Sequence, residues 1–125
     1  MDVNGRIAIV TGAARGIGKA ISTQLAKGGA QVIATDINED DLCDTHDELV
    51  DIGNKFLISR LDVTNQDSIN TAVKNIISEF SSIDILVNNA GTIGARGWEE
   101  RDVPDESDWD AIYAVNLKGM VKITE

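Results

Sequence analysis

Cysteine, positive charge and long apolar segments are all scarce in this sequence. The single cysteine, Cys43, cannot form a disulfide within the chain, which favours a reducing compartment and predicts a cytoplasmic location. The unbroken apolar runs, such as residues 7–10, are too short for the core of a signal peptide or for a membrane span. The 11 lysines and arginines stand against 21 aspartates and glutamates, and the net charge of −10 argues against a nucleic-acid or an anionic-membrane partner.

What the chain does contain is typical of one globular domain. Hydrophobic residues make up 42% of its 125 residues, enough to bury a core. The negative charge is concentrated in two segments: residues 36–51 hold eight acidic side chains and no lysine or arginine, and residues 99–110 hold seven with one arginine. We interpret these segments as a solvated helix and a solvated loop. An acidic docking surface is the alternative, and no other feature of the sequence supports it.

Short runs typical of β-strands alternate with longer segments of helical periodicity. The predicted strands cover residues 7–10, 31–35, 56 to about 63, and 83–87. The predicted helices cover residues 16–28, a segment capped by Asn38, a segment that Thr64 or Asn65 caps and that runs to Phe80, and a last segment that Ser107 caps. Strands that alternate with helices form a parallel sheet covered on both faces, since each crossover returns over the sheet. The predicted fold class is therefore α/β.

Several side chains are interpreted as packing residues rather than functional ones. The apolar spacing predicts buried faces made of Leu42, His46, Leu49 and Val50 in the second helix, and of Trp109, Ile112, Tyr113, Asn116 and Met120 in the last. Cys43 has no CxxC partner and is predicted to be a small buried group. Trp98 is also assigned to packing. The sequence shows no metal-ligand cluster, nucleophile elbow or Walker lysine.

A glycine-rich segment separates the first predicted strand from the first helix. Residues 11–18 read Thr-Gly-Ala-Ala-Arg-Gly-Ile-Gly, with the glycine spacing G-x-x-x-G-x-G. A turn of this kind lets the backbone approach a pyrophosphate, and the helix N terminus adds free N–H groups and a partial positive charge. Its position between a strand and a helix predicts a dinucleotide phosphate site.

Asp36 follows the second predicted strand and is a candidate ribose ligand. A carboxylate at this place accepts hydrogen bonds from the adenosine ribose hydroxyls and repels a 2′-phosphate. The alternative is an ordinary acidic residue at a helix entry. Arg15, inside the glycine turn, favours the opposite cofactor, because a guanidinium can pair with a 2′-phosphate. NAD is therefore favoured over NADP, and both stay open.

Four motifs resemble those of the short-chain dehydrogenase/reductases. They are the glycine turn, Asp62 with Val63 at the end of the third strand, Asn-Asn-Ala-Gly at residues 88–91, and Val-Asn-Leu-Lys-Gly at residues 115–119. The similarity runs from about residue 6 to the last residue. The resemblance implies a Rossmann-type, doubly wound parallel sheet in the order 3-2-1-4. Residues 1–125 would then form one dinucleotide-binding domain that is incomplete on its C-terminal side, since the family's chains are about twice as long.

The resemblance also implies the residues of a cofactor site. The implied cofactor-binding residues are Gly12, Arg15, Gly16, Ile17, Gly18, Asp36, Asp62, Val63, Asn89, Ala90 and Gly91. The three glycines of the turn would surround the pyrophosphate and Asp36 would hold the ribose. Asp62 and the Val63 backbone would contact the adenine, and the motif at residues 88–91 would line the nicotinamide end. Asn116 matches the asparagine that anchors a water in the family's proton relay, and it is the one catalytic residue implied.

The sequence lacks the family's Tyr-x-x-x-Lys acid/base pair. Tyr113 is the only tyrosine, the residue four positions on is Leu117, and Lys118 misses the register. The resemblance implies an oxidoreductase that transfers hydride between nicotinamide and an alcohol or carbonyl substrate, with this chain as a cofactor-binding half that is inactive alone. The alternative is a non-catalytic dinucleotide-binding or subunit-interaction module. The expected protein partner is a second copy in a homo-oligomer of the full-length protein, or a complementing C-terminal half.

Overall fold

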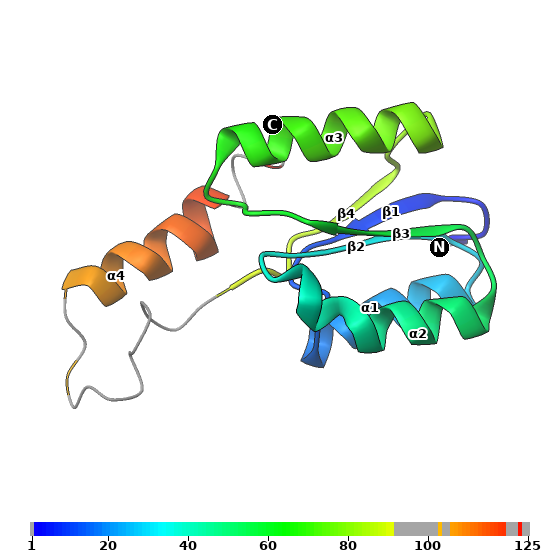
Figure 1. Cartoon of the computed structure of the whole chain (residues 1–125), viewed down its shortest axis with the longest axis horizontal. Coiled ribbons are helices and arrows are strands. Elements are labelled where there is room, and N and C mark those ends of the chain that lie inside the picture. The colour runs from blue at the N-terminus through cyan, green and yellow to red at the C-terminus, as the bar shows by residue number, and fades with distance from the viewer. Residues whose placement is uncertain (1, 92–102, 104–105, 120–122, 124–125) are drawn as a thin grey trace.

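The computed structural model describes residues 2–91, 103, 106–119 and 123, and its centre is one parallel sheet (Figure 1). The sheet consists of β1 (Ile7–Val10), β2 (Gln31–Asp36), β3 (Phe56–Arg60) and β4 (Ile85–Val87). The strand order is β3-β2-β1-β4, and every pair of neighbours is parallel. The predicted strand order is confirmed. Two strands are shorter than predicted, since β3 ends at Arg60 rather than near residue 63 and β4 begins at Ile85 rather than at residue 83.

Three helices connect the strands and cover both faces of the sheet. α1 (Gly16–Lys27) and α2 (Cys43–Ile52) lie on one face, and α3 (Gln66–Phe80) lies on the other (Figure 1). Of the two predicted caps of α3, Thr64 and Asn65, the structure shows Asn65, whose side-chain oxygen accepts a hydrogen bond from the Ser68 N–H at 3.1 Å. Each crossover between parallel strands therefore runs through a helix, as the alternation of elements requires.

The two remaining helical regions differ from the sequence prediction. A short 3₁₀ helix, η1 (Glu39–Leu42), leads into α2, and the Asn38 side chain makes no capping hydrogen bond there. α4 (Glu106–Ile112) begins one residue before the predicted cap, so Ser107 lies inside its first turn. From Tyr113 the helix continues in the wider π form as η3 (Tyr113–Gly119). Figure 1 shows α4 beyond one end of the sheet rather than on a face of it.

The central strands supply the core on both faces. β1 is buried along its whole length and β2 is buried except at its ends, which is typical of parallel strands between two helical layers. The cluster that includes α1 and α2 contains Val10, Val32, Ala34, Leu42 and Leu49, and the cluster under α3 contains Ile7, Ile9, Ile33, Ile76 and Phe80. Successive side chains along a strand point to opposite faces of the sheet, which divides the strand residues between the two clusters.

Four side chains predicted to be buried are exposed, so those predictions are wrong. Val50 is 51% exposed because its neighbour Leu49, at 1%, takes the position that faces the sheet. Cys43 is exposed at the outer side of the α2 N terminus, where its Sγ contacts the Asp40 carbonyl oxygen at 3.0 Å. Trp109 and Tyr113, four residues apart, are 62% and 51% exposed.

The remaining packing predictions have mixed outcomes. His46 packs edge-on against Phe56 with a ring-centroid distance of 5.4 Å, which agrees with a packing role. Its Nδ1 also lies 3.3 Å from the carboxylate of Asp47, a partner that the sequence pattern did not suggest. Trp98 and Met120 lie outside the described residues.

Candidate functional site

The turn between β1 and α1 depends on three glycines in two different ways. Gly12 has a φ of +66° and Gly16 a φ of +58°, both in the left-handed region that other residues rarely adopt. Gly18 lies in the first turn of α1, where a Cβ would collide with the Gly12 carbonyl oxygen. The glycines therefore allow a tight turn that brings the N terminus of α1 against the end of β1.

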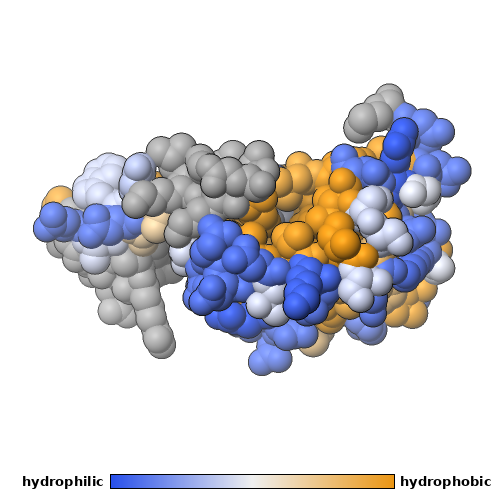
Figure 2. All heavy atoms as spheres, turned by 90° about the horizontal axis from the view of Figure 1, so that it is seen from above, coloured by the Kyte–Doolittle hydropathy of each residue, from blue (hydrophilic) through white to orange (hydrophobic). Residues whose placement is uncertain are grey.

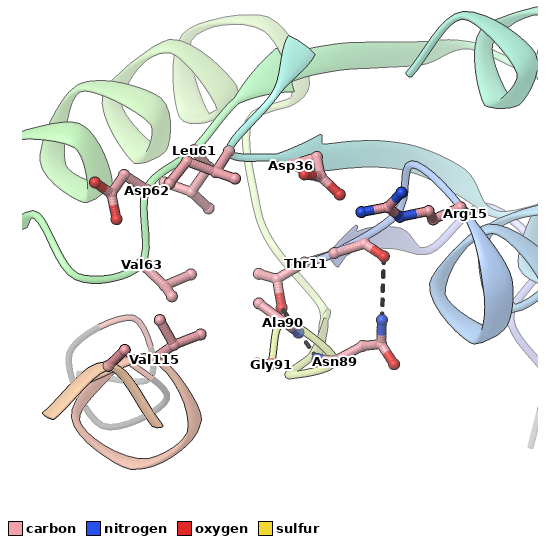
Figure 3. A pocket seen from close by; sticks show the side chains of 13 residues that line it. Thr11, Arg15, Asp36, Leu61, Asp62, Val63, Asn89, Ala90, Gly91 and Val115 are labelled. Carbon is pink, nitrogen blue, oxygen red and sulfur yellow. Dashed lines mark hydrogen bonds between the residues drawn. The ribbon is translucent and has the colours of Figure 1, made fainter. Parts of the chain in front are cut away.

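Hydrogen bonds fasten this turn to the segment that follows β4. The Asn89 Nδ2 donates to the Gly12 carbonyl oxygen at 3.1 Å (Figure 3). The backbone N–H groups of Asn89 and Ala90 both donate to Thr11 Oγ1 at 3.0 Å, and the Thr11 hydroxyl lies 3.2 Å from the Val87 carbonyl oxygen. Two of the sequence motifs thus meet through residues 77 positions apart.

A cavity of about 550 Å³ opens at the carboxyl ends of the strands (Figure 3). Parallel α/β sheets bind ligands at this edge, and the volume is in the range of small-molecule sites. The predicted cofactor residues that line it are Gly12, Arg15, Asp36, Asp62, Val63, Asn89, Ala90 and Gly91. The cavity therefore brings together residues from all four sequence motifs, the last of them through Val115.

The lining also includes residues outside the predicted cofactor-binding set, namely Thr11, Ile37, Leu61, Ala111 and Val115; of these, Thr11 and Val115 lie within two of the sequence motifs. Figure 3 shows Leu61 and Val63 on one side of the cavity and Val115, from the π-helical segment, approaching Val63. Ala111 and Val115 are four residues apart on the last helix, a spacing that indicates one face. That spacing does not indicate which strand ends the face lies against. The sequence alone therefore did not place the side chains of Ala111 and Val115 at the cavity.

Four predicted site residues do not line the cavity. Gly16 and Ile17 are exposed at the start of α1, and the Ile17 side chain is 72% exposed. Gly18 is buried against the turn, as described above. Asn116 lies beside the cavity: a Cβ added to Gly91 would be 3.4 Å from Asn116 Oδ1. Their predicted contacts with a cofactor therefore stay predictions.

Asp36 and Arg15 lie on the same side of the cavity (Figure 3). Asp36 ends β2, and its Oδ2 accepts a hydrogen bond from the Ala14 N–H at 3.2 Å. Its Oδ1 accepts the Asn38 N–H at 3.3 Å. Arg15 precedes α1 with an extended backbone and an exposed side chain. A carboxylate and a guanidinium thus stand near the point where the glycine turn meets the end of β2.

Asp62 is held in the turn between β3 and α3. Its Oδ1 accepts hydrogen bonds from the Thr64 N–H at 2.9 Å and from the Thr64 hydroxyl at 2.6 Å. The Asp62 N–H donates to Ser68 Oγ at 3.0 Å. These contacts fix the carboxylate at the rim of the cavity, next to the buried side chains of Leu61 and Val63.

Two other features, a metal centre and a membrane-spanning helix, are absent from the part of the chain that the structure describes. Within these residues, no group of three or more His, Cys, Asp or Glu side chains is placed to hold a metal ion. No helix among them is long and apolar enough to cross a membrane.

The order of the strands, the glycine turn after β1 and the acidic residue at the end of β2 define a Rossmann-type α/β domain. The family model for the short chain dehydrogenases matches residues 6–125. The chain belongs to the short-chain dehydrogenase/reductase family.

Curated relatives match the whole of this chain. It is 38% identical over 129 residues to the 3-oxoacyl-[acyl-carrier-protein] reductase FabG of Thermotoga maritima, covering 100% of this chain and 50% of the relative. It is 37% identical over 125 residues to the (2S)-[(R)-hydroxy(phenyl)methyl]succinyl-CoA dehydrogenase subunit BbsD of Thauera aromatica, covering 100% and 49%. The chain thus spans about half the length of the curated relatives it matches.

Solved structures match to the same extent. A short chain dehydrogenase/reductase from Burkholderia phymatum, in complex with NAD, superposes with a TM-score of 0.86 at 27% identity over 99% of this chain and 43% of that chain. A metagenomic short-chain oxidoreductase in complex with NADP superposes with a TM-score of 0.83 at 32% identity over 98% and 55%. Both dinucleotides therefore occur among the structures that this chain resembles.

Proposed function

We propose that this chain binds a nicotinamide dinucleotide, NAD in preference to NADP, as the cofactor-binding half of an oxidoreductase. The bound nicotinamide would supply hydride transfer to or from an alcohol or carbonyl substrate. The observation that carries the proposal is the cavity itself. It brings together the glycine turn, Asp36, Asp62 with Val63, and the segment after β4, which are four separate stretches of sequence.

The glycine turn is the proposed site of the pyrophosphate. The turn exposes the backbone of Gly16 at the start of α1, where the first N–H groups of a helix have no partner within the helix. Those groups and the helix dipole favour a bound anion. Arg15 stands beside them and lines the same cavity. Gly12, Gly16, Ile17 and Gly18 would together form this end of the site.

Asp36 is the proposed ligand of the adenosine ribose. Its carboxylate already accepts two backbone N–H groups, and a charged acceptor at the end of β2 favours ribose hydroxyls over a 2′-phosphate. Asp62 and Val63 lie further along the same edge of the sheet and would contact the adenine. Ala90 and Gly91 follow β4, and they would line the nicotinamide end beside Asn116.

The acid/base chemistry would need residues that this sequence does not contain. Tyr113 is the only tyrosine, it is 51% exposed, and the residue four positions after it is Leu117 rather than a lysine. We expect Asn116 to orient a water rather than to transfer the proton itself. Turnover would therefore require a Tyr-x-x-x-Lys from further polypeptide, as a continuation of the chain or as a complementing C-terminal half. For the chain alone, the absence of a Tyr-x-x-x-Lys pair favours the alternative function, a non-catalytic binding module.

Fluorescence titration of the 125-residue chain with NADH and with NADPH tests the proposal. We expect NADH to bind more tightly. In Asp36→Ala, NADH affinity should fall and the preference over NADPH should shrink by about tenfold, because a charged hydrogen-bond acceptor and a repulsive charge are lost together. Asp36→Asn is the matched control, since its amide oxygen can still accept the Ala14 N–H while the charge is gone.

The outcomes separate the parts of this proposal. In Asp36→Asn the preference should shrink while the melting temperature stays close to that of the wild type. If both dinucleotides bind to Asp36→Ala as they bind to the wild type, Asp36 is not at the ribose. If neither dinucleotide binds to the wild-type chain, the cofactor-binding role itself is wrong for this chain.

A further inference from the structure

A buried threonine from α2 reaches across to the glycine turn. Thr45 is 0% exposed, and its hydroxyl donates to the Ala13 carbonyl oxygen at 2.7 Å. The Ala14 carbonyl oxygen is also close, at 3.4 Å from the same Oγ1. The hydroxyl therefore holds two consecutive carbonyls in the middle of the turn, 31 and 32 positions away in the sequence.

The same two residues are held from the opposite side by β2. The Ala13 N–H donates to the Thr35 carbonyl oxygen at 2.9 Å, and the Ala14 N–H donates to Asp36 Oδ2 at 3.2 Å. Both alanines are buried, at 0% and 5% exposure. Every backbone polar group of Ala13 and Ala14 thus has a protein partner. Ala13 and Ala14 therefore form the buried, hydrogen-bonded part of the turn. Arg15 and Gly16, which follow them, are exposed and accessible to a ligand.

The contact with the turn is not required to satisfy the threonine hydroxyl. A threonine in a helix can donate to a carbonyl of the preceding turn of its own helix. Thr23 does this in α1, where its hydroxyl donates to the Ala20 carbonyl oxygen at 3.0 Å. Thr45 instead donates to a separate segment, so its hydroxyl fixes the distance between α2 and the glycine turn.

We propose that Thr45 is a positioning residue for dinucleotide binding: it fixes the base of the glycine turn so that the first N–H groups of α1 point to the pyrophosphate. This inference rests on the proposed cofactor function. Lys19 and Glu48 support the same geometry, because their side chains form an ion pair at 3.1 Å between α1 and α2. A turn that is already held in its bound geometry loses less conformational entropy when the ligand binds.

The test compares Thr45→Val, Thr45→Ser and Thr23→Val in the 125-residue chain. Valine keeps the shape and removes the hydroxyl, whereas serine keeps the donor. Thr23→Val is the matched control, since it removes a buried hydroxyl that donates only within α1. Dissociation constants for NADH are measured at a temperature where each variant is fully folded, as shown by its melting curve. Hydrogen–deuterium exchange of residues 11–18 is followed without ligand.

Thr45→Val should weaken NADH binding by about fivefold to tenfold, the effect of losing one hydrogen bond that holds the site. It should also speed exchange in the turn. Thr45→Ser should restore most of both properties, and Thr23→Val should leave both near wild type. If Thr45→Val lowers only the melting temperature, or if it matches Thr23→Val in affinity and exchange, the inference is wrong while the proposed function stands. If the wild-type chain does not bind NADH, the proposed function is wrong and this inference goes with it.

Discussion

Replacing Gly18 with alanine should destabilise the fold, although the same change in the middle of an ordinary helix stabilises it. A glycine-to-alanine change in a helix usually gains about 0.5–1 kcal/mol. At Gly18 the new Cβ would collide with the Gly12 carbonyl oxygen and lie 2.5 Å from Asn89 Nδ2. It would therefore push apart two groups whose hydrogen bond, 3.1 Å long, fastens the turn to the segment after β4.

The expected size of the effect follows from three contributions. Overpacking a tight contact costs about 1–3 kcal/mol. Loss of the hydrogen bond between Asn89 and Gly12 adds about 1 kcal/mol, and the higher helix propensity of alanine offsets about 0.5–1 kcal/mol. The free energy of unfolding should therefore fall by about 1–3 kcal/mol. For a chain of this length, each kcal/mol lowers the melting temperature by about 4 °C.

Urea unfolding followed by far-ultraviolet circular dichroism measures this difference. Gly16→Ala is the comparison, because a Cβ at Gly16 meets nothing within 4 Å and only its φ of +58° is unfavourable. That variant should lose about 1 kcal/mol. In a double-mutant cycle, Asn89→Ala should reduce the cost of Gly18→Ala, since it removes one of the two groups in the way. A Gly18→Ala protein as stable as the wild type, or costs that simply add, would refute the steric argument.

Three further predictions concern the cap, the core and turnover. Asn65→Ala should lower the free energy of unfolding by about 1 kcal/mol, because the Ser68 N–H loses its acceptor, and Asn65→Asp should not. Leu49→Ala should lower the free energy of unfolding, measured in urea, by about 2–5 kcal/mol because Leu49 is buried. Val50→Ala, at the exposed neighbouring position, should lower it by less than about 0.5 kcal/mol. The 125-residue chain should show no steady NADH oxidation with any carbonyl substrate. Sustained turnover would contradict the assignment of the acid/base pair to other polypeptide.

The fold could be predicted from the sequence because local pattern and connectivity agree. Apolar runs bounded by turn residues mark the strands, and the spacing of Ile69, Ile76 and Phe80 marks the buried face of α3. The sheet order came from the four motifs, whose resemblance to one family covers the chain. Parallel strands joined by helices must cross over with a right-handed connection, and few strand orders satisfy this condition. The pattern of elements in a short sequence was therefore enough to predict the fold class.

The exposed side chains show where pattern alone is insufficient. Leu49 and Val50 are adjacent and both apolar, yet the rotation of about 100° between neighbours in a helix places one against the sheet and the other in solvent. Trp109 and Tyr113 occupy one face of the last helix, and periodicity predicts such a face without saying what packs on it.

The candidate site was predictable where glycine or charge marks it, and not where packing does. Gly12 could be predicted because a glycine directly after a strand permits a tight turn, and Asp36 because a carboxylate at the end of a strand can accept hydrogen bonds from a ligand. Thr11 and Thr45 carry no such mark. Their hydroxyls become part of the site only because β4 and α2 bring other backbone groups within hydrogen-bond distance.

The fastening of the glycine turn to the segment after β4 also bears on the order in which the molecule folds. The hydrogen bond from Thr35 to Val10 joins residues 25 positions apart, whereas that from Asn89 to Gly12 joins residues 77 apart. The longer loop loses more chain entropy on closing, so β4 should dock late. An intermediate with β1, β2 and β3 paired would carry the turn without Asn89 beside it. Affinity for a dinucleotide would then arise only in the final folding step, and a bound dinucleotide would slow the first step of unfolding.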